Sequence, residues 1–234
     1  ASPDIRDQIA RAAPLYPKTL RGSPIGAVVL TNGDVDHVAG LLTLREKTGF
    51  DLQATPEVLD ALAANPIFAV MDPHLIARKP AALGGKLTLE GGLEAEIFAV
   101  PGKVPLYQEQ GDVTTDEIGE TTIGLRLSSS GGGVAYYIPG CAALPDDLIA
   151  KLQDADLLLF DGTVWENEEM PRMGAGTKTG RRMGHLPISG DGGSMERLAG
   201  LNARKIYIHI NNTNPILQPA STERRAISAG GWEI

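Results

Sequence analysis

Short apolar stretches alternate along the chain with amphipathic segments, which is typical of a fold that mixes strands and helices. Apolar and β-branched runs bounded by turn-forming residues predict strands at 26–30, 93–100, 121–127, 134–138, 157–160 and 205–210. Apolar residues at helical spacing predict helices at 3–13, 39–47, 55–64, 146–153 and 194–198. Ser2 is the expected cap of the first helix, and Gly131-Gly132-Gly133 predicts a hairpin between two strands.

Length and composition favour one soluble domain. With 234 residues, 42% of them hydrophobic, the chain can bury a single substantial core. Its 21 Lys and Arg against 29 Asp and Glu give a net charge of -8, which repels a phosphate backbone and excludes nucleic acid as a partner. The sequence contains neither an apolar run of about 18 residues nor a signal-peptide pattern, so we expect no membrane segment.

The single cysteine, Cys141, excludes an intrachain disulfide framework and a cysteine-rich structural zinc site. This suits a reducing compartment, and we therefore expect a cytoplasmic protein. The chain opens in a helix-start signal without Met and stops at GGWEI, where a further strand begins. We therefore expect a fragment of a longer chain.

The most informative segment is the polar turn NGDVDH at 32–37, between the first predicted strand and a helix. Asn32, Asp34, Asp36 and His37 lie close enough in such a turn to point at one ion, and carboxylates with neutral imidazole suit divalent iron, manganese or zinc. The alternative is structural, with Asx turns at Asn32 and Asp34 and a helix cap at Asp36. An EF-hand calcium loop is excluded because no Glu follows at the required spacing.

His209, near the end of the last predicted strand, is a second candidate ligand. A strand end holds a side chain rigidly, but a lone histidine in an apolar strand is more often a satisfied core residue. Asn211, Asn212 and Asn214 follow it, and their structural role is to build the turn before the next proline.

The glycine-rich segment at 173–193 has no apolar periodicity and is too long for a simple connector, which favours a functional loop over a disordered one. Its glycines let the backbone approach a ligand, and Lys178, Arg181 and Arg182 are suited to holding carboxylates beside His185. The alternative is a solvated basic loop.

Seven segments carry a family resemblance: ASPDIR at 1–6, LTNGDVDHVAGLLTLRE at 30–46, VPGKVPLY at 100–107, YIPGCA at 137–142, LLLFDGTVWENEEM at 157–170, GAGTKTGRRMGH at 174–185 and HINNTNPIL at 209–217. In this order they resemble the pyrroloquinoline quinone (PQQ) biosynthesis protein B family of the metallo-β-lactamase superfamily. The resemblance implies one α/β (α+β) domain at 1–234, a four-layer αββα sandwich with the metallo-β-lactamase fold. The family's N-terminal segment with its cysteine cluster and its last strand are absent, so we expect the domain to be incomplete at both ends.

Hydrolases of this superfamily carry an H-x-H-x-D-H motif. Aligned with the polar turn, this motif places Asn32 and Asp34 at its first two histidines, and only Asp36 and His37 match it. The resemblance therefore implies that part of the superfamily's two-metal site is lost.

Two later superfamily ligands are also replaced. Lys103 follows Pro-Gly where a histidine would stand, Cys141 takes the place of a bridging aspartate, and the last histidine is kept as His209. The first metal site is thus removed and the second spared. A protonated lysine cannot bind a metal, so we expect Lys103 to fill the vacated site as an ion pair with Asp34. For Cys141, core packing is favoured over metal ligation.

The spared residues Asp36, His37 and His209 are the ligand set of non-haem iron(II) oxygenases. The resemblance implies iron- and oxygen-dependent hydroxylation of the tyrosine ring in a peptide-derived Glu-Tyr precursor of PQQ, with Fe(II) as cofactor and zinc as a substitute. In this interpretation Asp34 tunes or supplements the site, and His185 acts as an acid or base beyond the metal ligands.

Lys178, Arg181, Arg182 and Asn211 are the expected substrate contacts. The expected partners are the small peptide-derived substrate and O2. The sequence neither predicts nor excludes association into a homodimer. Two other functions compete with the oxygenase. A non-catalytic carrier for transport of PQQ or its precursor needs the basic loop but no redox metal, whereas a zinc-dependent hydrolase needs a metal-bound water and more imidazole than remains.

Overall fold

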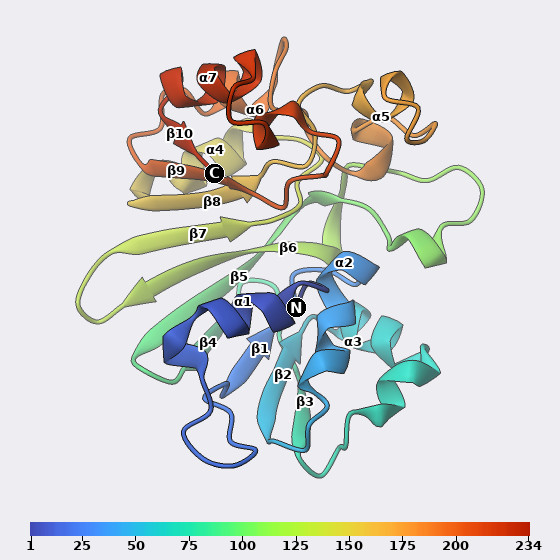
Figure 1. Ribbon diagram of the computed structural model, residues 1–234, viewed down its shortest axis with the longest axis vertical. Helices are drawn as coiled ribbons and strands as arrows, with labels where there is room; N and C mark the ends of the chain where they lie inside the picture. The colour runs from blue at the N-terminus through green and yellow to red at the C-terminus, as the bar shows by residue number, and fades with distance from the viewer.

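The computed structural model describes residues 1–234, which form ten strands and seven α-helices (Figure 1). The strands are β1 (Ala27–Val29), β2 (Phe50–Ala54), β3 (Ile76–Pro80), β4 (Lys86–Leu89), β5 (Leu93–Gly102), β6 (Glu117–Ser129), β7 (Val134–Ile138), β8 (Leu157–Asp161), β9 (Arg204–Ile208) and β10 (Trp232–Glu233). The α-helices are α1 (Ile5–Arg11), α2 (Val35–Val38), α3 (Pro56–Ala63), α4 (Asp146–Lys151), α5 (Glu169–Arg172), α6 (Ser194–Arg197) and α7 (Thr222–Ala229). Short 3₁₀ helices lie at Ala13–Leu15, Ala39–Leu44, Pro66–Val70, Leu106–Gln108, Leu152–Asp154, Arg181–Met183 and Pro215–Leu217.

Two sheets organise the chain. A parallel sheet has the order β1-β2-β3, and a larger sheet has the order β10-β9-β8-β7-β6-β5-β4. Within the larger sheet, β4 to β7 pair antiparallel and β7 to β10 pair parallel. In Figure 1, α1 to α3 lie beside the small sheet, and α4, α6 and α7 lie beside the parallel half of the larger one. This arrangement confirms the predicted four-layer αββα sandwich.

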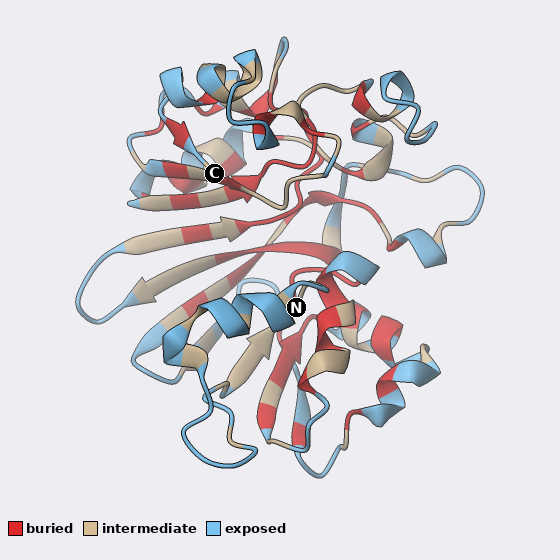
Figure 2. Ribbon diagram, viewed as in Figure 1, coloured by how far each residue is buried: buried red, intermediate tan, exposed pale blue.

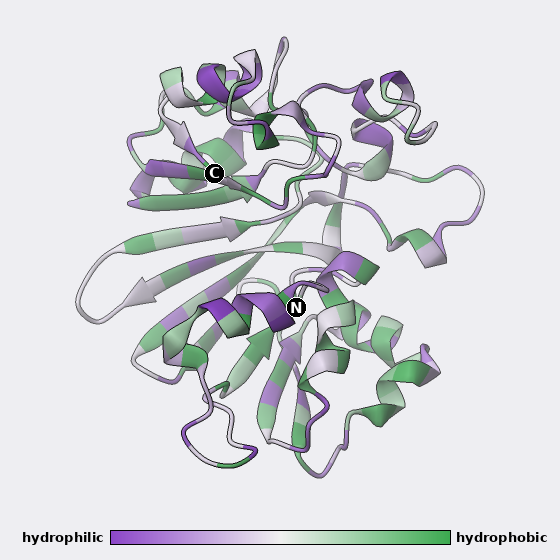
Figure 3. Ribbon diagram, in the orientation of Figure 1, coloured by the Kyte–Doolittle hydropathy of each residue, from purple (hydrophilic) through white to green (hydrophobic).

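Apolar packing joins the layers. Between the two sheets, Ile97, Ile123 and Leu125 are buried and pack with Val29 and Leu87. Two larger apolar clusters complete the core, one between each sheet and the helices that cover it. The buried residues therefore follow the strands in Figure 2. Figure 3 shows the matching hydropathy pattern, with apolar positions along the strands and polar positions on α1 and α7. The burial of these apolar faces is the main force that holds the sandwich together.

All six predicted strands are present, but two helix predictions are wrong in detail. The segment 39–47 is not an α-helix; it follows α2 as the 3₁₀ helix Ala39–Leu44, because the Gly40 amide bonds to Ala1 O at 2.9 Å instead of to a helical carbonyl. Ser2 does not cap α1, which begins at Ile5, since Ser2 packs against Gly40. None of the helices combines the length and the apolar character that crossing a bilayer requires.

Candidate metal centre

Polar side chains gather where β1, β8 and β9 end. Asp36 and His37 lie in α2, just after β1, while Asp161 ends β8 and His209 directly follows β9. β8 and β9 are parallel neighbours, and the isolated bridge from Asn32 to β6 ties the end of β1 to the larger sheet. Because parallel strands present their carboxyl ends at one edge, residues far apart in the chain meet there.

Asp36, His37 and His209 form the group that the sequence predicts. Their ligand atoms all lie within 4.8 Å of one another. His209 Nε2 lies 2.8 Å from Asp36 Oδ2, and the rings of His37 and His209 have centroids 4.6 Å apart. Asp36 is exposed whereas His37 is buried, so the group is open on the carboxylate side. Two imidazoles and a carboxylate at this spacing fit one divalent iron or zinc ion after small side-chain shifts.

The protonation states of Asp36, His37 and His209 are compatible with metal binding. Burial, together with the charge of His209, lowers the pKa of His37 to about 3, so its imidazole is neutral. Burial alone would lower the pKa of His209, but the carboxylates of Asp161 and Asp36 outweigh it and raise this pKa to about 10. Burial opposes ionisation of Asp36, yet the hydrogen bond with His209 holds the pKa of this carboxyl well below its usual range. A bound metal would therefore replace one proton, the one shared by Asp36 and His209.

His209 is aimed into the centre by its backbone and by Thr163. Its φ of +54° lies in the left-handed region, which side-chain-bearing residues seldom adopt, and it takes His209 out of the strand alternation. His209 Nδ1 lies 2.8 Å from Thr163 Oγ1, and because Thr163 gives its one hydroxyl proton to Asp161 Oδ1 at 2.6 Å, Nδ1 is the donor in this contact. Because Nδ1 is used in this way, Nε2 faces Asp36 and is the nitrogen available to a metal.

Asp161, His185 and His209 form an adjacent group of ligand types. Asp161 is fully buried, and its oxygens accept hydrogen bonds from Cys141 N (3.0 Å), His185 Nδ1 (2.7 Å), Thr163 N (3.1 Å) and Thr163 Oγ1 (2.6 Å). These four bonds fill the acceptor positions of a carboxylate, so Asp161 is suited to orienting the two imidazoles. Burial would raise the pKa of Asp161, but the neighbouring imidazoles lower it well below its usual range.

Sequence reasoning misses Asp161 and Thr163. Both belong to FDGT, directly after the predicted strand at 157–160, and the available signal was an acidic residue at the end of a buried strand. It also misses Glu109, which lies in a loop whose sequence carries no motif or periodicity that marks it.

The expected ion pair between Lys103 and Asp34 is confirmed. Lys103 is buried, and its Nζ lies 3.9 Å from Asp34 Oδ2. Burial raises the pKa of Asp34, against the opposing effects of the Leu106 amide, which donates at 2.8 Å, and of Lys103. Asn32 Oδ1 accepts from Asp34 N at 2.9 Å, which is the Asx turn of the structural alternative. The ammonium group of Lys103 and the Asx turn at Asn32 thus occupy the side of the centre where Asp34 lies.

Two of the three predicted substrate-binding cations contact a carboxylate of the chain itself. Lys178 Nζ donates to Glu109 Oε2 at 2.7 Å, and Arg182 makes a two-pronged contact with Glu109 at 3.0 and 3.2 Å. Lys103 Nζ approaches the same carboxylate at 3.2 Å. The third predicted cation, Arg181, is exposed. The basic loop is therefore an ordered part of the site's surroundings.

Two other predicted residues have structural contacts. Asn211 Nδ2 lies 3.0 Å from both Thr213 Oγ1 and Met170 Sδ, which favours the turn-building alternative for this side chain. Cys141 is completely buried in the larger core, as core packing requires. Burial raises the pKa of its thiol, and the charge of Asp161 raises it further.

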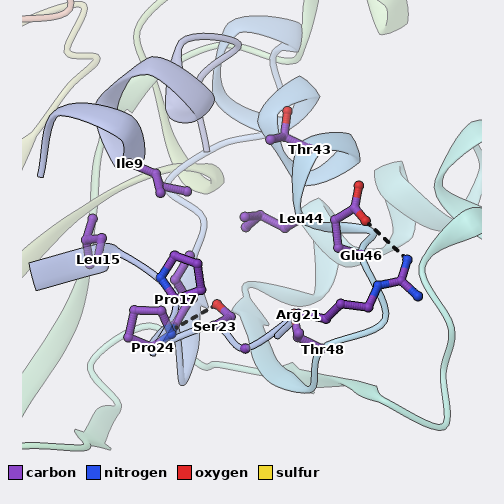
Figure 4. A pocket seen from close by; sticks show the side chains of 12 residues that line it. Ile9, Leu15, Pro17, Arg21, Ser23, Pro24, Thr43, Leu44, Glu46 and Thr48 are labelled. Atoms are coloured by element: carbon purple, nitrogen blue, oxygen red, sulfur yellow. Dashed lines mark hydrogen bonds and ion pairs between the residues drawn. The ribbon is translucent and has the colours of Figure 1, made fainter. Parts of the chain in front are cut away.

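The pocket drawn in Figure 4 lies away from this centre, between α1 and the segment after it on one side and residues 43–48 on the other. Ile9, Leu15 and Leu44 supply its apolar wall, and an exposed ion pair joins Arg21 to Glu46 at 3.9 Å. It is lined by no histidine or cysteine, so it does not compete as a metal site.

Comparisons with known proteins agree with this architecture. Residues 1–210 match the family model described as the beta-lactamase superfamily domain. The chain is 56% identical over 234 residues to the coenzyme PQQ synthesis protein B of Ruegeria pomeroyi, covering all of this chain and 79% of that protein. It is 53% identical over 235 residues to the protein of the same name from Rhizobium meliloti, covering all of this chain and 77% of that protein.

Among solved structures, zinc-bound PqqB from Methylobacterium extorquens superposes with a TM-score of 0.96 at 48% identity, covering all of this chain and 78% of that one. A diphosphatase of the PhnP family superposes with a TM-score of 0.64 at 19% identity, covering all of this chain and 73% of that one. At 19% identity, the similarity to the diphosphatase shows only that the two chains share a fold.

Proposed function

The chain belongs to the coenzyme PQQ synthesis protein B family within the beta-lactamase superfamily, and on this premise we propose that it acts in PQQ synthesis through one bound metal ion. The observation that carries the proposal is the meeting of Asp36, His37 and His209, which come from opposite ends of the chain. The zinc bound by the relative from Methylobacterium extorquens supports a metal in this family.

Asp36, His37 and His209 are the proposed ligands. They are preferred over the group that contains Asp161 because all acceptor positions of that carboxylate are engaged, whereas Asp36 has a single partner, His209. The metal would be Fe(II), with zinc as a substitute, and Fe(II) would supply the activation of O2 that an aromatic hydroxylation needs.

The proposed reaction is hydroxylation of the tyrosine ring in a small peptide-derived Glu-Tyr precursor. One atom of O2 enters a ring C–H bond, and the other is reduced to water with two electrons from an external reductant. The support is the ligand set of two imidazoles and one carboxylate, which is that of non-haem iron(II) oxygenases, together with the loss of the superfamily's first metal site.

His185 is the proposed acid or base beside this site. Its Nδ1 donates to the buried Asp161, which fixes the ring and leaves Nε2 to accept or release a proton. Asp34, whose pKa is raised by burial, supplements the acidic side of the centre. The cations of the basic loop, Lys178, Arg181 and Arg182, are the proposed contacts for substrate carboxylates.

The test is reconstitution of the metal-free protein with Fe(II) or with Zn(II), followed by incubation with a Glu-Tyr peptide, a reductant and O2. We expect O2 consumption and a hydroxylated tyrosyl product with Fe(II) only. A product that forms with zinc in the absence of O2 would identify a hydrolase, and tight binding of PQQ or its precursor without any turnover would identify a carrier.

Matched variants separate the site from the rest of the fold. His37→Ala removes a proposed ligand, whereas His74→Ala removes an exposed histidine in a turn far along the chain from the site segments. The proposal requires His37→Ala to abolish product formation and His74→Ala to leave it unchanged.

A further inference from the structure

Three cations surround one carboxylate beside the metal centre. Glu109 is in contact with Lys103, Lys178 and Arg182, and only 10% of its side chain is exposed. The only other carboxylate paired with any of these cations is Asp34, which lies 3.9 Å from Lys103. The three positive charges around Glu109 are therefore paired directly with only two carboxylates, with Asp112 as a further acidic neighbour of Arg182, and their partly desolvated position favours an anion at the place that Glu109 occupies.

The segment that carries Glu109 is attached through Leu106 and Tyr107, which donate to Asp34 and to Gly33 O, and is weakly attached from Glu109 onward. Its backbone amide bonds only to Leu106 O, at 3.3 Å, within the same turn. From 110 to 116 no residue forms a backbone hydrogen bond outside the regular elements, and most of these residues are exposed. The ion pairs of its side chain are thus the main attachment of Glu109, and an incoming carboxylate can replace each of them.

The cation cluster adjoins the metal centre. Lys103 lies beside Asp34, two residues before Asp36, and its aliphatic chain passes Gly184 so closely that an added Cβ there would lie 3.1 Å from Lys103 Cγ. Gly184 in turn precedes His185, which hydrogen-bonds Asp161 at the centre. A ligand whose carboxylate replaced that of Glu109 would therefore lie next to the proposed metal ligands.

We propose that Lys103, Lys178 and Arg182 form a binding subsite for a ligand carboxylate, and that Glu109 fills this subsite until the ligand displaces it. This inference rests on the proposed function in one respect, namely that the substrate carries carboxylates. Because a tethered carboxylate competes at an effective concentration on the order of millimolar, Glu109 weakens carboxylate binding and favours ligands that make further contacts at the centre.

The experiment uses glutarate as the probe and glutaramide as its uncharged control, with calorimetry on the metal-free chain. Glu109→Gln removes the competing charge, and we expect it to bind glutarate about tenfold more tightly than the parent does. Asp116→Asn removes one negative charge from the same loop without an ion pair to the three cations, so it is expected to match the parent. Adding Lys178→Met to Glu109→Gln should reverse the gain. Equal or weaker binding of glutarate by Glu109→Gln would overturn the proposal and make Glu109 a structural link.

Displacement itself is measured in the parent with a glutamate-specific protease. Saturating glutarate should speed cleavage after Glu109 severalfold, while cleavage after the exposed Glu46 stays constant as an internal control. Unchanged cleavage after Glu109 would overturn the proposal. Because no metal is present, these results do not depend on the oxygenase reaction. If that reaction fails, the binding and cleavage results still test the carboxylate subsite.

Discussion

Asp36 Oδ2 and His209 Nε2 lie 2.8 Å apart although 173 positions separate them in the chain. The contact joins α2, which follows β1 of the small sheet, to the residue after β9 of the larger one, so it forms only when the whole sandwich is assembled. Without a metal, a proton links the two side chains; in the proposed function, the same two atoms would bind the metal. The metal-free contact is therefore a precursor of the proposed metal site.

Thr163→Val should weaken metal binding about 10- to 100-fold, as loss of a hydrogen bond behind a ligating histidine typically does. The valine keeps the shape of the side chain but cannot accept the proton of His209 Nδ1 or donate to Asp161. Thr163→Ser retains the hydroxyl and is expected to bind metal like the parent. Affinities are measured by competition with a chromophoric chelator. Equal affinities for the valine and serine variants would show that the Thr163 hydroxyl does not support metal binding.

The metal-free protein should lose stability as pH rises above neutrality. His209 has a folded-state pKa of about 10, above the ordinary value of about 6.5 expected in the unfolded chain. Its stabilising contribution is complete below the unfolded pKa and disappears as pH rises through the folded pKa, since between the two only the folded state holds the proton.

Thermal unfolding midpoints between pH 6.5 and pH 10 measure this effect. His209→Gln removes the titrating group, so the fall across this window should be smaller in that variant. If the parent and His209→Gln decline in parallel, His209 does not hold its proton as described.

Cys141 should be chemically inert in the folded protein. Burial and the nearby charge of Asp161 raise the pKa of its thiol, and a protonated thiol is a poor nucleophile and a poor metal ligand. We expect no alkylation of Cys141 by iodoacetamide until the chain is unfolded, and an unchanged metal content in Cys141→Ala. Loss of metal from a folded Cys141→Ala variant would make the thiol a ligand.

The sequence predicts the elements whose apolar pattern is strong. The strands that form β5 to β8 appear where expected, because their residues are buried in the sheet and show clear runs. The strand β3 was missed because four of its five residues are exposed, so the segment Ile76–Pro80 carries almost no apolar signal. The 3₁₀ helix at Ala39–Leu44 was expected to be an α-helix, since the contact of Gly40 with Ala1 depends on tertiary structure alone.

The candidate ligands Asp36, His37 and His209 were predictable from motif and resemblance, whereas their supporting residues were not. Asp161 acquires its role from four hydrogen bonds that reach it from separate segments, and no local pattern encodes such a meeting. Glu109 is similar, because only the folded loops bring three cations around it.

The most direct test of the central claim is the metal content and affinity of the purified chain and of single variants. We expect one Fe(II) or Zn(II) ion per chain in the parent and in His74→Ala, and affinity reduced by more than about 100-fold in His37→Ala and in His209→Ala, because loss of a ligand exceeds loss of its support. Retention of the ion by both ligand variants, or its loss from His185→Ala but not from His37→Ala, would contradict the assignment of Asp36, His37 and His209 as the metal site.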